Sequence, residues 1–197
     1  MLMNLFTFRH SFRNRYTRAV SRILLPFIAA AFIGCGAFEA DSGPSGIAID
    51  PSDNIYVSYT TGSFINKFSS SGTLTLKWPA RVPGWSLDSG PFGVAIWPGG
   101  GYVCVTDIVN GIVQIFTSSG SYYSQYGAGA SFNNPEGIAV DSSGNMYVTD
   151  YGNNRVYIFI SGGGVSQWNT AGTGNGEFEG PVGIAAYLNT YVYVADY

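Results

Sequence analysis

The chain has 197 residues, of which 46% are hydrophobic, 16% aromatic and only 11% charged. This length is sufficient for one domain with a sizeable core. All 12 acidic residues follow residue 34, whereas only four of the nine basic residues do, so residues 35–197 carry a net charge of −8. A nucleic-acid backbone is bound through clustered Lys and Arg, and this excess of acid therefore argues against a nucleic-acid partner.

The first 34 residues are expected to form a leader that precedes the folded domain. An arginine-rich segment is followed by Ile23–Gly34, an apolar run of 12 residues that contains Pro26. A membrane-spanning helix needs about 20 apolar residues, so the run predicts the core of a signal peptide. An uncleaved membrane anchor is the alternative. Residues 35–42 would form a short linker, and the protein is expected to be exported to the cell envelope or secreted.

Small residues surround Cys35, at the end of this leader. The sequence Phe32-Ile33-Gly34-Cys35 resembles a bacterial lipobox, although Phe32 replaces the leucine that the pattern prefers. The resemblance implies that Cys35 is a lipid-attachment site, which would anchor the protein to a membrane. Cleavage after Ala37, which would leave the protein without a lipid, is the alternative.

One pattern occurs four times along residues 43–197. Each copy begins with Gly-Pro or Asn-Pro, continues with a glycine two residues after the proline, and enters a short apolar run. The four starts are Gly43–Asp50, Gly90–Ile96, Asn134–Asp141 and Gly180–Ala186. Successive prolines are 47, 44 and 46 residues apart. We therefore place repeat units at about residues 43–80, 90–128, 134–172 and 180–197.

The third copy shows what one unit contains. Four short runs rich in β-branched and aromatic residues predict strands at Gly137–Val140, Met146–Thr149, Arg155–Ile160 and Gly164–Trp168. Clusters of Asp, Ser, Gly and Asn between them predict tight turns. Four antiparallel strands in a unit of about 44 residues are typical of a β-propeller blade.

At these positions the chain resembles the NHL repeat family. The resemblance rests on P-x-G-I-A-V-D-x-x-G-N-x-Y-V-x-D-x-G-N-N-R-V in the third copy. It implies an all-β fold, a propeller of NHL type with four-stranded antiparallel blades, usually six in the family. The other copies depart from the pattern: Tyr59 replaces the second Asp, Trp97 the first, and Phe64 and Ile112 the Arg. A role for the family's arginine therefore transfers only to Arg155.

The predicted propeller is incomplete, with about three and a half blades. The fourth copy stops after its second strand, at Tyr197. Each uncovered aromatic side chain forfeits on the order of 4–6 kcal/mol of gross burial energy, and Tyr191–Tyr197 would leave a bare apolar strand edge. We therefore expect either a fragment of a longer protein or a ring completed by self-association with a second copy.

The residue types that most enzymes need are scarce. The single histidine, His10, lies in the leader. Amidating lyases and paraoxonase-like lactonases, which resemble this chain, use histidines as metal ligands or bases. Cys104 takes the place of a strand tyrosine and is expected to be a buried free thiol, since no histidine is left to activate it. We predict no catalytic residue and no cofactor.

Carboxylates are the remaining candidates for a metal site. Gluconolactonase-like propellers, by resemblance, hold a divalent cation such as calcium with carboxylates. The candidates are Asp107, Glu136, Asp141, Asp150 and Asp196. Most recur at equivalent repeat positions, which predicts a role in blade structure. Only Glu136 does not recur, since its counterparts are Ser45, Phe92 and Val182, so it is the one weak metal candidate.

Three of these aspartates and Arg155 are predicted to serve the repeat structure. Asp107, Asp150 and Asp196 each follow the second strand of a copy. Asp150 is expected to cap the following turn, and Arg155 to lay its stem across the neighbouring blade. Asp50-Pro51-Ser52-Asp53-Asn54 is predicted to be a turn, with a Ca²⁺ loop as the alternative.

The sequence favours an exported, non-catalytic binding or scaffold module. It would present the loop face of the propeller to a protein, peptide or glycan. The alternative is part of a metal-dependent, lactonase-like hydrolase whose remaining blades supply the rest of the site. The family resemblance implies no single function, because the propeller fold hosts many activities.

Overall fold

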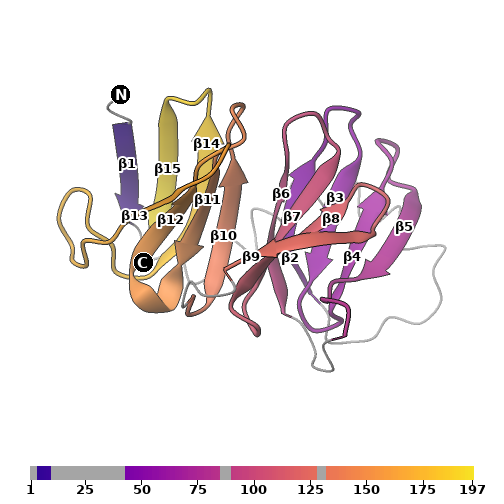
Figure 1. Cartoon of the computed structure of the whole chain (residues 1–197), viewed down its shortest axis with the longest axis horizontal. Helices are drawn as coiled ribbons and strands as arrows, with labels where there is room; N and C mark the ends of the chain where they lie inside the picture. Colours follow the sequence, from indigo (N-terminus) through magenta and orange to yellow (C-terminus); the bar gives the residue numbers. More distant parts are fainter. Residues whose placement is uncertain (1–3, 10–42, 85–89, 128–131) are drawn as a thin grey trace.

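The computed structural model describes residues 4–9, 43–84, 90–127 and 132–197. These residues form four β-sheets that lie side by side (Figure 1), three of them with four strands and one with three. Within each four-stranded sheet the strands follow chain order and are antiparallel, as in the meander that the sequence predicts. The all-β, incomplete propeller expected from the repeats is confirmed.

The three complete blades have closely matched bounds. Blade 1 contains β2 (Pro44–Ile49), β3 (Ile55–Tyr59), β4 (Phe64–Phe68) and β5 (Leu74–Pro79). Blade 2 contains β6 (Pro91–Ile96), β7 (Tyr102–Asp107), β8 (Ile112–Thr117) and β9 (Tyr122–Tyr126). Blade 3 contains β10 (Pro135–Val140), β11 (Met146–Asp150), β12 (Arg155–Phe159) and β13 (Val165–Trp168), with a 3-10 turn at Tyr151–Asn153.

The fourth sheet differs from the other three. It contains β14 (Pro181–Tyr187) and β15 (Tyr191–Asp196), which are antiparallel, and β1 (Asn4–Arg9), which runs parallel to β15. Figure 1 shows β1 beside β15. The bare edge expected along Tyr191–Tyr197 is therefore paired in the 197-residue chain, by a segment that the sequence assigned to the leader. In a chain without residues 1–34 this partner strand would be missing. The other residues of the predicted leader and linker lie outside the described residues.

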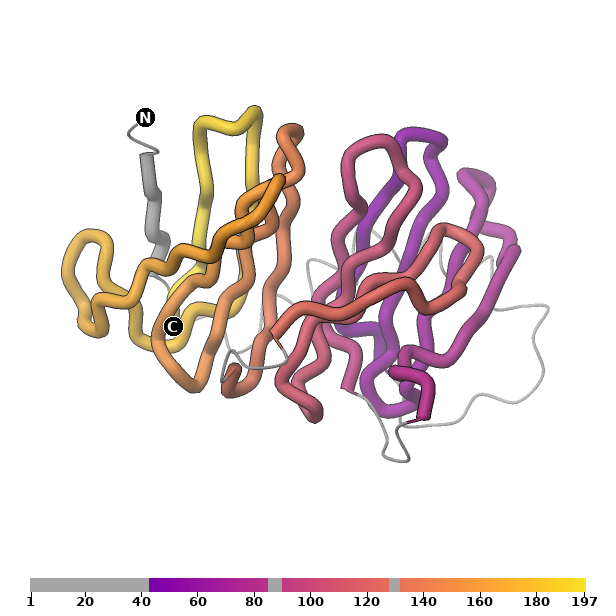
Figure 2. The backbone as a smooth tube through the Cα atoms, in the orientation of Figure 1, coloured from indigo at the N-terminus to yellow at the C-terminus, as the bar shows by residue number. Residues whose placement is uncertain are grey.

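The innermost strands are β2, β6, β10 and β14, which neighbour one another in that order along the chain of blades (Figure 2). Each begins at the repeat proline, two residues before the predicted start at the glycine. The two residues after the proline form a bulge, since the pairing shifts between Pro135 and Ile138 in blade 3 and at the same place in the other blades. A bulge leaves backbone groups unpaired within the sheet, so they are available to a neighbouring blade.

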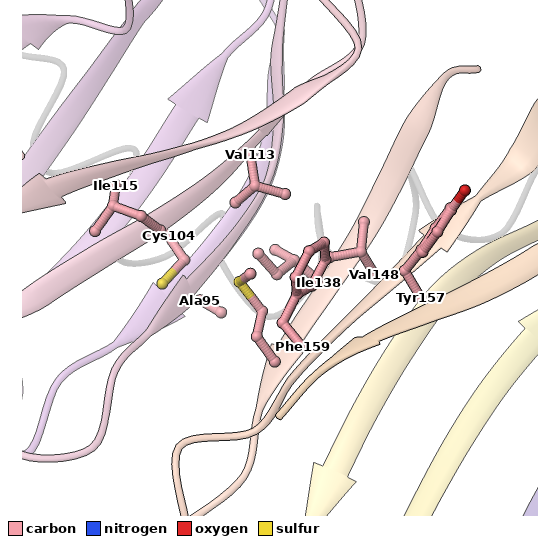
Figure 3. Close-up of a cluster of buried hydrophobic side chains, with 9 residues drawn as sticks. Ala95, Cys104, Val113, Ile115, Ile138, Val148, Tyr157 and Phe159 are labelled. Carbon is pink, nitrogen blue, oxygen red and sulfur yellow. The ribbon is translucent and has the colours of Figure 1, made fainter. Parts of the chain in front are cut away.

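The core lies between blades. The cluster in Figure 3 joins Ala95, Cys104, Val113 and Ile115 of blade 2 to five residues of blade 3: Ile138, Met146, Val148, Tyr157 and Phe159. Equivalent clusters join blade 1 to blade 2 and blade 3 to the fourth sheet. Cys104 is fully buried here, and its thiol is free, as predicted. Burial raises the pKa of this thiol well above its usual range, which favours the protonated form over the nucleophilic thiolate.

The outer-strand tryptophans also pack between blades. The ring of Trp78 lies edge-on to Tyr56 at 6.3 Å and tilted against Phe116 of blade 2 at 6.1 Å. Trp168 stacks on Tyr147 of its own blade at 6.1 Å and packs against the apolar cluster between blade 3 and the fourth sheet. Both tryptophans therefore contribute to the contacts between neighbouring blades.

Candidate functional site

The two ends of the blades differ in what they present. One end, here called the turn face, carries the tight turns at residues 50–54, 97–101, 141–145 and 187–190. The opposite end, here called the loop face, carries the connections at residues 60–63, 108–111 and 151–154 and the starts of the innermost strands. Glu136 is the second residue of β10 and therefore belongs to the loop face, close to where the innermost strands meet.

The aspartates at the ends of the second strands accept hydrogen bonds from backbone N–H groups, including those of residues just before the innermost strand of the same blade. Asp107 Oδ1 accepts hydrogen bonds from the N–H of Gly90 at 2.9 Å and of Asn110 at 3.0 Å. Asp150 Oδ1 accepts from the N–H of Asn133 at 2.7 Å, and both oxygens of Asp196 accept from the N–H of Glu179. All three carboxylates are buried. These carboxylates therefore hold in place the segments that connect one blade to the next.

Asp150 and Arg155 act within one blade. Asp150 Oδ2 accepts from the side-chain amide of Asn153 at 2.6 Å and lies 3.9 Å from Arg155 Nε. Burial raises the pKa of Asp150, partly offset by these hydrogen bonds and by the guanidinium charge. The guanidinium also lies 5.6 Å from the ring centre of Tyr157. In the described chain the contacts of Arg155 stay within blade 3, rather than crossing to the neighbouring blade.

The aspartates that open the turns on the turn face are also fully engaged. Asp141 Oδ1 accepts from the N–H groups of Ser143 and Asn145 at 2.9 Å, and Oδ2 accepts from Tyr147 Oη at 3.0 Å. Asp50 makes the same contacts with Ser52, Asn54 and Tyr56. Burial opposes the ionisation of Asp50, but its hydrogen bonds outweigh burial and lower its pKa. Because the oxygens of Asp50 already accept hydrogen bonds from these groups, a turn at residues 50–54 is favoured over a Ca²⁺ loop.

A hydroxyl group joins each blade to the next, which the sequence analysis did not predict. Thr149 Oγ1 accepts from the N–H of Gly137 in its own blade at 2.7 Å and donates to the carbonyl of Val182 in the fourth sheet at 2.8 Å. Thr106 makes the same bridge to the carbonyl of Glu136, and Ser58 to that of Phe92. The available signal was the recurrence of Ser or Thr at this position in three copies.

The glycine two residues after each repeat proline allows the innermost strands of neighbouring blades to lie close together. A Cβ atom on Gly93 would lie 2.4 Å from the carbonyl oxygen of Glu136, and one on Gly137 would lie 2.3 Å from that of Val182. Real Cβ atoms do not come so close to a backbone oxygen, so only glycine allows the next innermost strand to pack here. The hydroxyl bridge and the glycine together hold the backbone of Glu136.

Glu136 differs from the buried aspartates of the blades because its side chain has no hydrogen-bond partner among the described residues. Within the described residues, its carboxylate makes no hydrogen bond or ion pair, and it is half-buried. Burial raises the pKa of this carboxyl. The equivalent residues of the other innermost strands are Ser45, Phe92 and Val182. Glu136 is therefore the one charged residue at this position of the four described innermost strands.

Exposed tyrosines lie on the same face as Glu136. Tyr151 follows β11 and is 36% exposed, and Tyr197 follows β15 and is 56% exposed. A Cβ atom on Gly180 would lie 3.0 Å from Cε2 of Tyr151 and 3.4 Å from Cβ of Tyr197, so the two tyrosines flank this glycine. At the equivalent Gly90 the flanking residues are aliphatic, namely Ile108 and Val109.

In the described ranges, no three His, Cys, Asp or Glu residues gather closely enough to hold a metal ion. The predicted lipid-attachment residue, Cys35, lies outside these ranges. No helix in the described part of the chain has the length and hydrophobicity to cross a bilayer.

This architecture places the protein among β-propellers built from sequence repeats. A streptogramin B lyase structure superimposes with a TM-score of 0.64 at 17% identity, over 79% of this chain and 49% of the lyase. An inactive variant of virginiamycin B lyase from Staphylococcus aureus, solved with quinupristin, gives 0.63 at 17% identity, over 82% and 52%. The WD40 repeats of RRP9 give 0.59 at 18% identity, over 77% and 44%.

The third repeat is similar to the NHL repeat. The family model described as NHL repeat matches residues 132–159, which cover the last residues before β10 and the strands β10 to β12. The resemblance found in the third copy is thereby confirmed. Among curated proteins, no sequence matches this chain. The chain spans about half the length of these similar structures, and the likeness to them concerns the fold alone.

Proposed function

We propose that this chain is an exported, non-catalytic binding or scaffold module that presents its loop face to a protein, peptide or glycan. The observation that carries the proposal is the contrast between these carboxylates. The buried aspartates of the described blades are hydrogen-bonded to backbone and neighbouring side chains, whereas the carboxylate of Glu136 has no partner in the described residues and lies on the face that carries the exposed rings of Tyr151 and Tyr197. A protein ligand is the preferred class, because loop-borne aromatic residues are enriched in protein interfaces.

The proposal is tested by capture of envelope proteins on the immobilised full chain. A variant with Tyr151→Ala and Tyr197→Ala removes two exposed rings from the loop face, and Ile160→Ala, which removes an exposed apolar side chain at the other end of blade 3, serves as the matched control. We expect a specific protein to be enriched by the wild-type chain and the control, but lost with the double variant. Equal recovery on all three surfaces would contradict the proposal.

Export and lipid anchoring form a separate part of the proposal. The support is the apolar run Ile23–Gly34 and the sequence around Cys35. If Cys35 carries a lipid, the mature protein will partition into membranes and its intact mass will include acyl chains. Cys35→Ser should then move the protein to the soluble fraction. Unchanged partitioning of Cys35→Ser would refute the anchor, and retention of residues 1–34 in the mature protein would refute the leader.

Completion of the ring is also a proposal, in which a second copy or additional blades cover the apolar surfaces of the outer sheets. Ile49 of β2 is 61% exposed, whereas its counterpart Val140 packs against the cluster between blades 2 and 3. Tyr187 of β14 is 58% exposed. If the 197-residue chain self-associates, light scattering will give twice its mass of 21.0 kDa. A monomer at all concentrations would contradict self-association.

The alternative function is a metal-dependent, lactonase-like hydrolase, favoured only by the position of Glu136 near the innermost strands. If it holds, a divalent cation such as calcium will raise the melting temperature of the protein, the shift will be lost in Glu136→Gln, and a lactone will be turned over. Absence of any shift with calcium, magnesium or manganese would count against this alternative.

A further inference from the structure

We propose that the loop face of blades 3 and 4 binds the cationic side chain of a peptide ligand, with Glu136 as the carboxylate and Tyr151 and Tyr197 as neighbouring aromatic surfaces. This inference names a ligand class for the loop face and rests on the proposed binding function.

Glu136 combines a fixed backbone with a carboxylate that has no partner among the described residues. Its backbone is held, because the carbonyl accepts from Thr106 Oγ1 at 2.7 Å and the next residue, Gly137, donates to Thr149 at 2.7 Å. Its carboxylate, in contrast, has no partner in the described chain. A half-buried anion on a rigid backbone loses water without gaining a compensating bond. An incoming cation would supply that bond without any rearrangement of the strands.

Among the described residues, the positions equivalent to Glu136 on the neighbouring strands carry no charge. The counterparts of Glu136 on the neighbouring strands are Phe92 on β6 and Val182 on β14. Three of the four basic residues after residue 34 are engaged elsewhere: Lys67 donates to the carbonyl of Ser118, Lys77 lies 3.6 Å from the ring centre of Phe64, and Arg155 pairs with Asp150. The contact of Lys67 crosses from blade 1 to blade 2, and those of Lys77 and Arg155 stay within their own blades, so each of the three cations has a partner other than Glu136.

Tyr151 and Tyr197 lie on the same face of the blades as Glu136. The N–H of Tyr151 donates to the carbonyl of Asn134, two residues before Glu136, at 3.1 Å. Tyr197 lies across Gly180 from Tyr151, next to the strand that contains Val182. The face of an aromatic ring attracts an ammonium or guanidinium group, so these rings add to what the carboxylate supplies. Blade 2 offers Ile108 and Val109 at the equivalent place.

The same geometry is poorly suited to a metal ion. Calcium takes six to eight oxygen ligands and magnesium six, whereas one carboxylate between apolar side chains provides at most two from the described residues. A lysine or arginine side chain needs only one carboxylate and an apolar or aromatic surface for its stem. The residues around Glu136 are therefore matched to an organic cation.

The test uses the full chain and three acetylated, amidated pentapeptides that differ only at the central residue, which is lysine, arginine or norleucine. Binding is measured by calorimetry at low salt. We expect the two cationic peptides to bind at least about tenfold more tightly than the norleucine peptide. Glu136→Gln should reduce their affinity about tenfold, and Tyr151→Leu about threefold.

Asp53→Asn is the matched control, because it removes one carboxylate from an exposed turn on the turn face and keeps the residue shape at a backbone φ of 61°. It should leave peptide affinity unchanged. Equal binding of all three peptides, or an equal loss in Glu136→Gln and Asp53→Asn, would overturn the inference. So would calcium binding that depends on Glu136.

The inference and the proposed function can fail separately. A partner captured on the loop face with equal yield by wild type and Glu136→Gln would refute the cation site and leave the binding function intact. Peptide binding that requires Glu136, without any captured partner, would support the site and count against the scaffold function. Circular dichroism of each variant confirms that the blades remain folded.

Discussion

Thr149 shows how one hydroxyl group can join two blades. It satisfies an N–H that the bulge in β10 leaves without a partner in the sheet, and it donates to the first strand of the next blade. The same arrangement occurs at Thr106 and Ser58. In β15 the counterpart is Ala195, which has no hydroxyl group to offer a further strand.

We expect Thr149→Val to destabilise the protein by about 1–3 kcal/mol, because the substitution keeps the shape but leaves the Gly137 N–H and the Val182 carbonyl without this partner. Thr149→Ser should retain most of the stability. Urea unfolding followed by circular dichroism measures both. A Val variant as stable as wild type would show that the bridge contributes nothing.

Glu136 should make the stability of the protein depend on pH. Burial raises its pKa in the folded state above the ordinary value of 4.5, so folding favours the protonated form. Its stabilising contribution is therefore present below pH 4.5 and is lost as the pH rises through the folded-state pKa. Glutamine does not titrate. We expect Glu136→Gln to be more stable than wild type at pH 7 and the difference to disappear at acidic pH.

Thermal unfolding of wild type and Glu136→Gln between pH 3 and pH 8 measures this difference. A constant gap across that range would contradict the pKa argument. A stabilising effect of the substitution at pH 7 would also show that the carboxylate is retained at a cost to the fold, as is common at binding sites.

At the scale of the element, the turn on the turn face is built as a unit of three residues. Asp141, Asn145 and Tyr147 are hydrogen-bonded together, as are Asp50, Asn54 and Tyr56. Blade 2 replaces both the Asp and the Tyr, with Trp97 and Cys104. A buried tyrosine hydroxyl without its carboxylate partner would be costly, so joint replacement is the physically consistent change.

A double-mutant cycle on Asp141→Asn and Tyr147→Phe tests this coupling. Because each single change leaves the other group with a weakened or missing partner, we expect a coupling free energy of about 0.5–3 kcal/mol. Urea unfolding of the four proteins provides the measurement. Strict additivity would mean that the two side chains are energetically independent.

The bulged start of the innermost strand is the second element-level feature. We expect Gly93→Ala to destabilise the protein by about 1–3 kcal/mol or more, because the new methyl group would collide with the carbonyl of Glu136 and push blades 2 and 3 apart. Gly101→Ala is the control, since a Cβ there meets nothing within 4 Å. Thermal melts should show a loss only for Gly93→Ala.

At the scale of the whole molecule, blades are stabilised mainly by their neighbours. The described apolar clusters between blades draw on both partners, so each blade depends on the next one. Strands β7, β8 and β11 are buried along almost their whole length, whereas the outer strand β13 is largely exposed. Stability should therefore be distributed unevenly across the structure.

Hydrogen exchange can measure this distribution. We expect the amides of β7, β8 and β11 to exchange at least about tenfold more slowly than those of β13, because their opening requires separation of packed blades. Peptide-resolved mass spectrometry would follow the exchange. Uniform exchange rates across these strands would indicate that the blades open as one cooperative unit.

Much of the fold could be predicted from sequence because its signals are local and repeated. Alternating apolar residues bounded by turn residues predicted the strands of the third copy, with errors only at their ends: β10 begins at Pro135 and β13 at Val165. Those ends were missed because a bulge and a neighbouring blade, rather than local propensity, define them. The pairing of β1 with β15 also had no local signal.

The candidate site was predictable only in part. The sequence by itself determined that the Asp residues recur and that Glu136 does not, since this follows from the register of the copies. Only the tertiary structure decided that the Asp carboxylates are consumed by hydrogen bonds, that Thr106 fixes the backbone of Glu136, and that Tyr151 and Tyr197 meet at Gly180. The physical reason is that these contacts join different blades, whose approach is set by packing between sheets and not by the order of residues within one repeat.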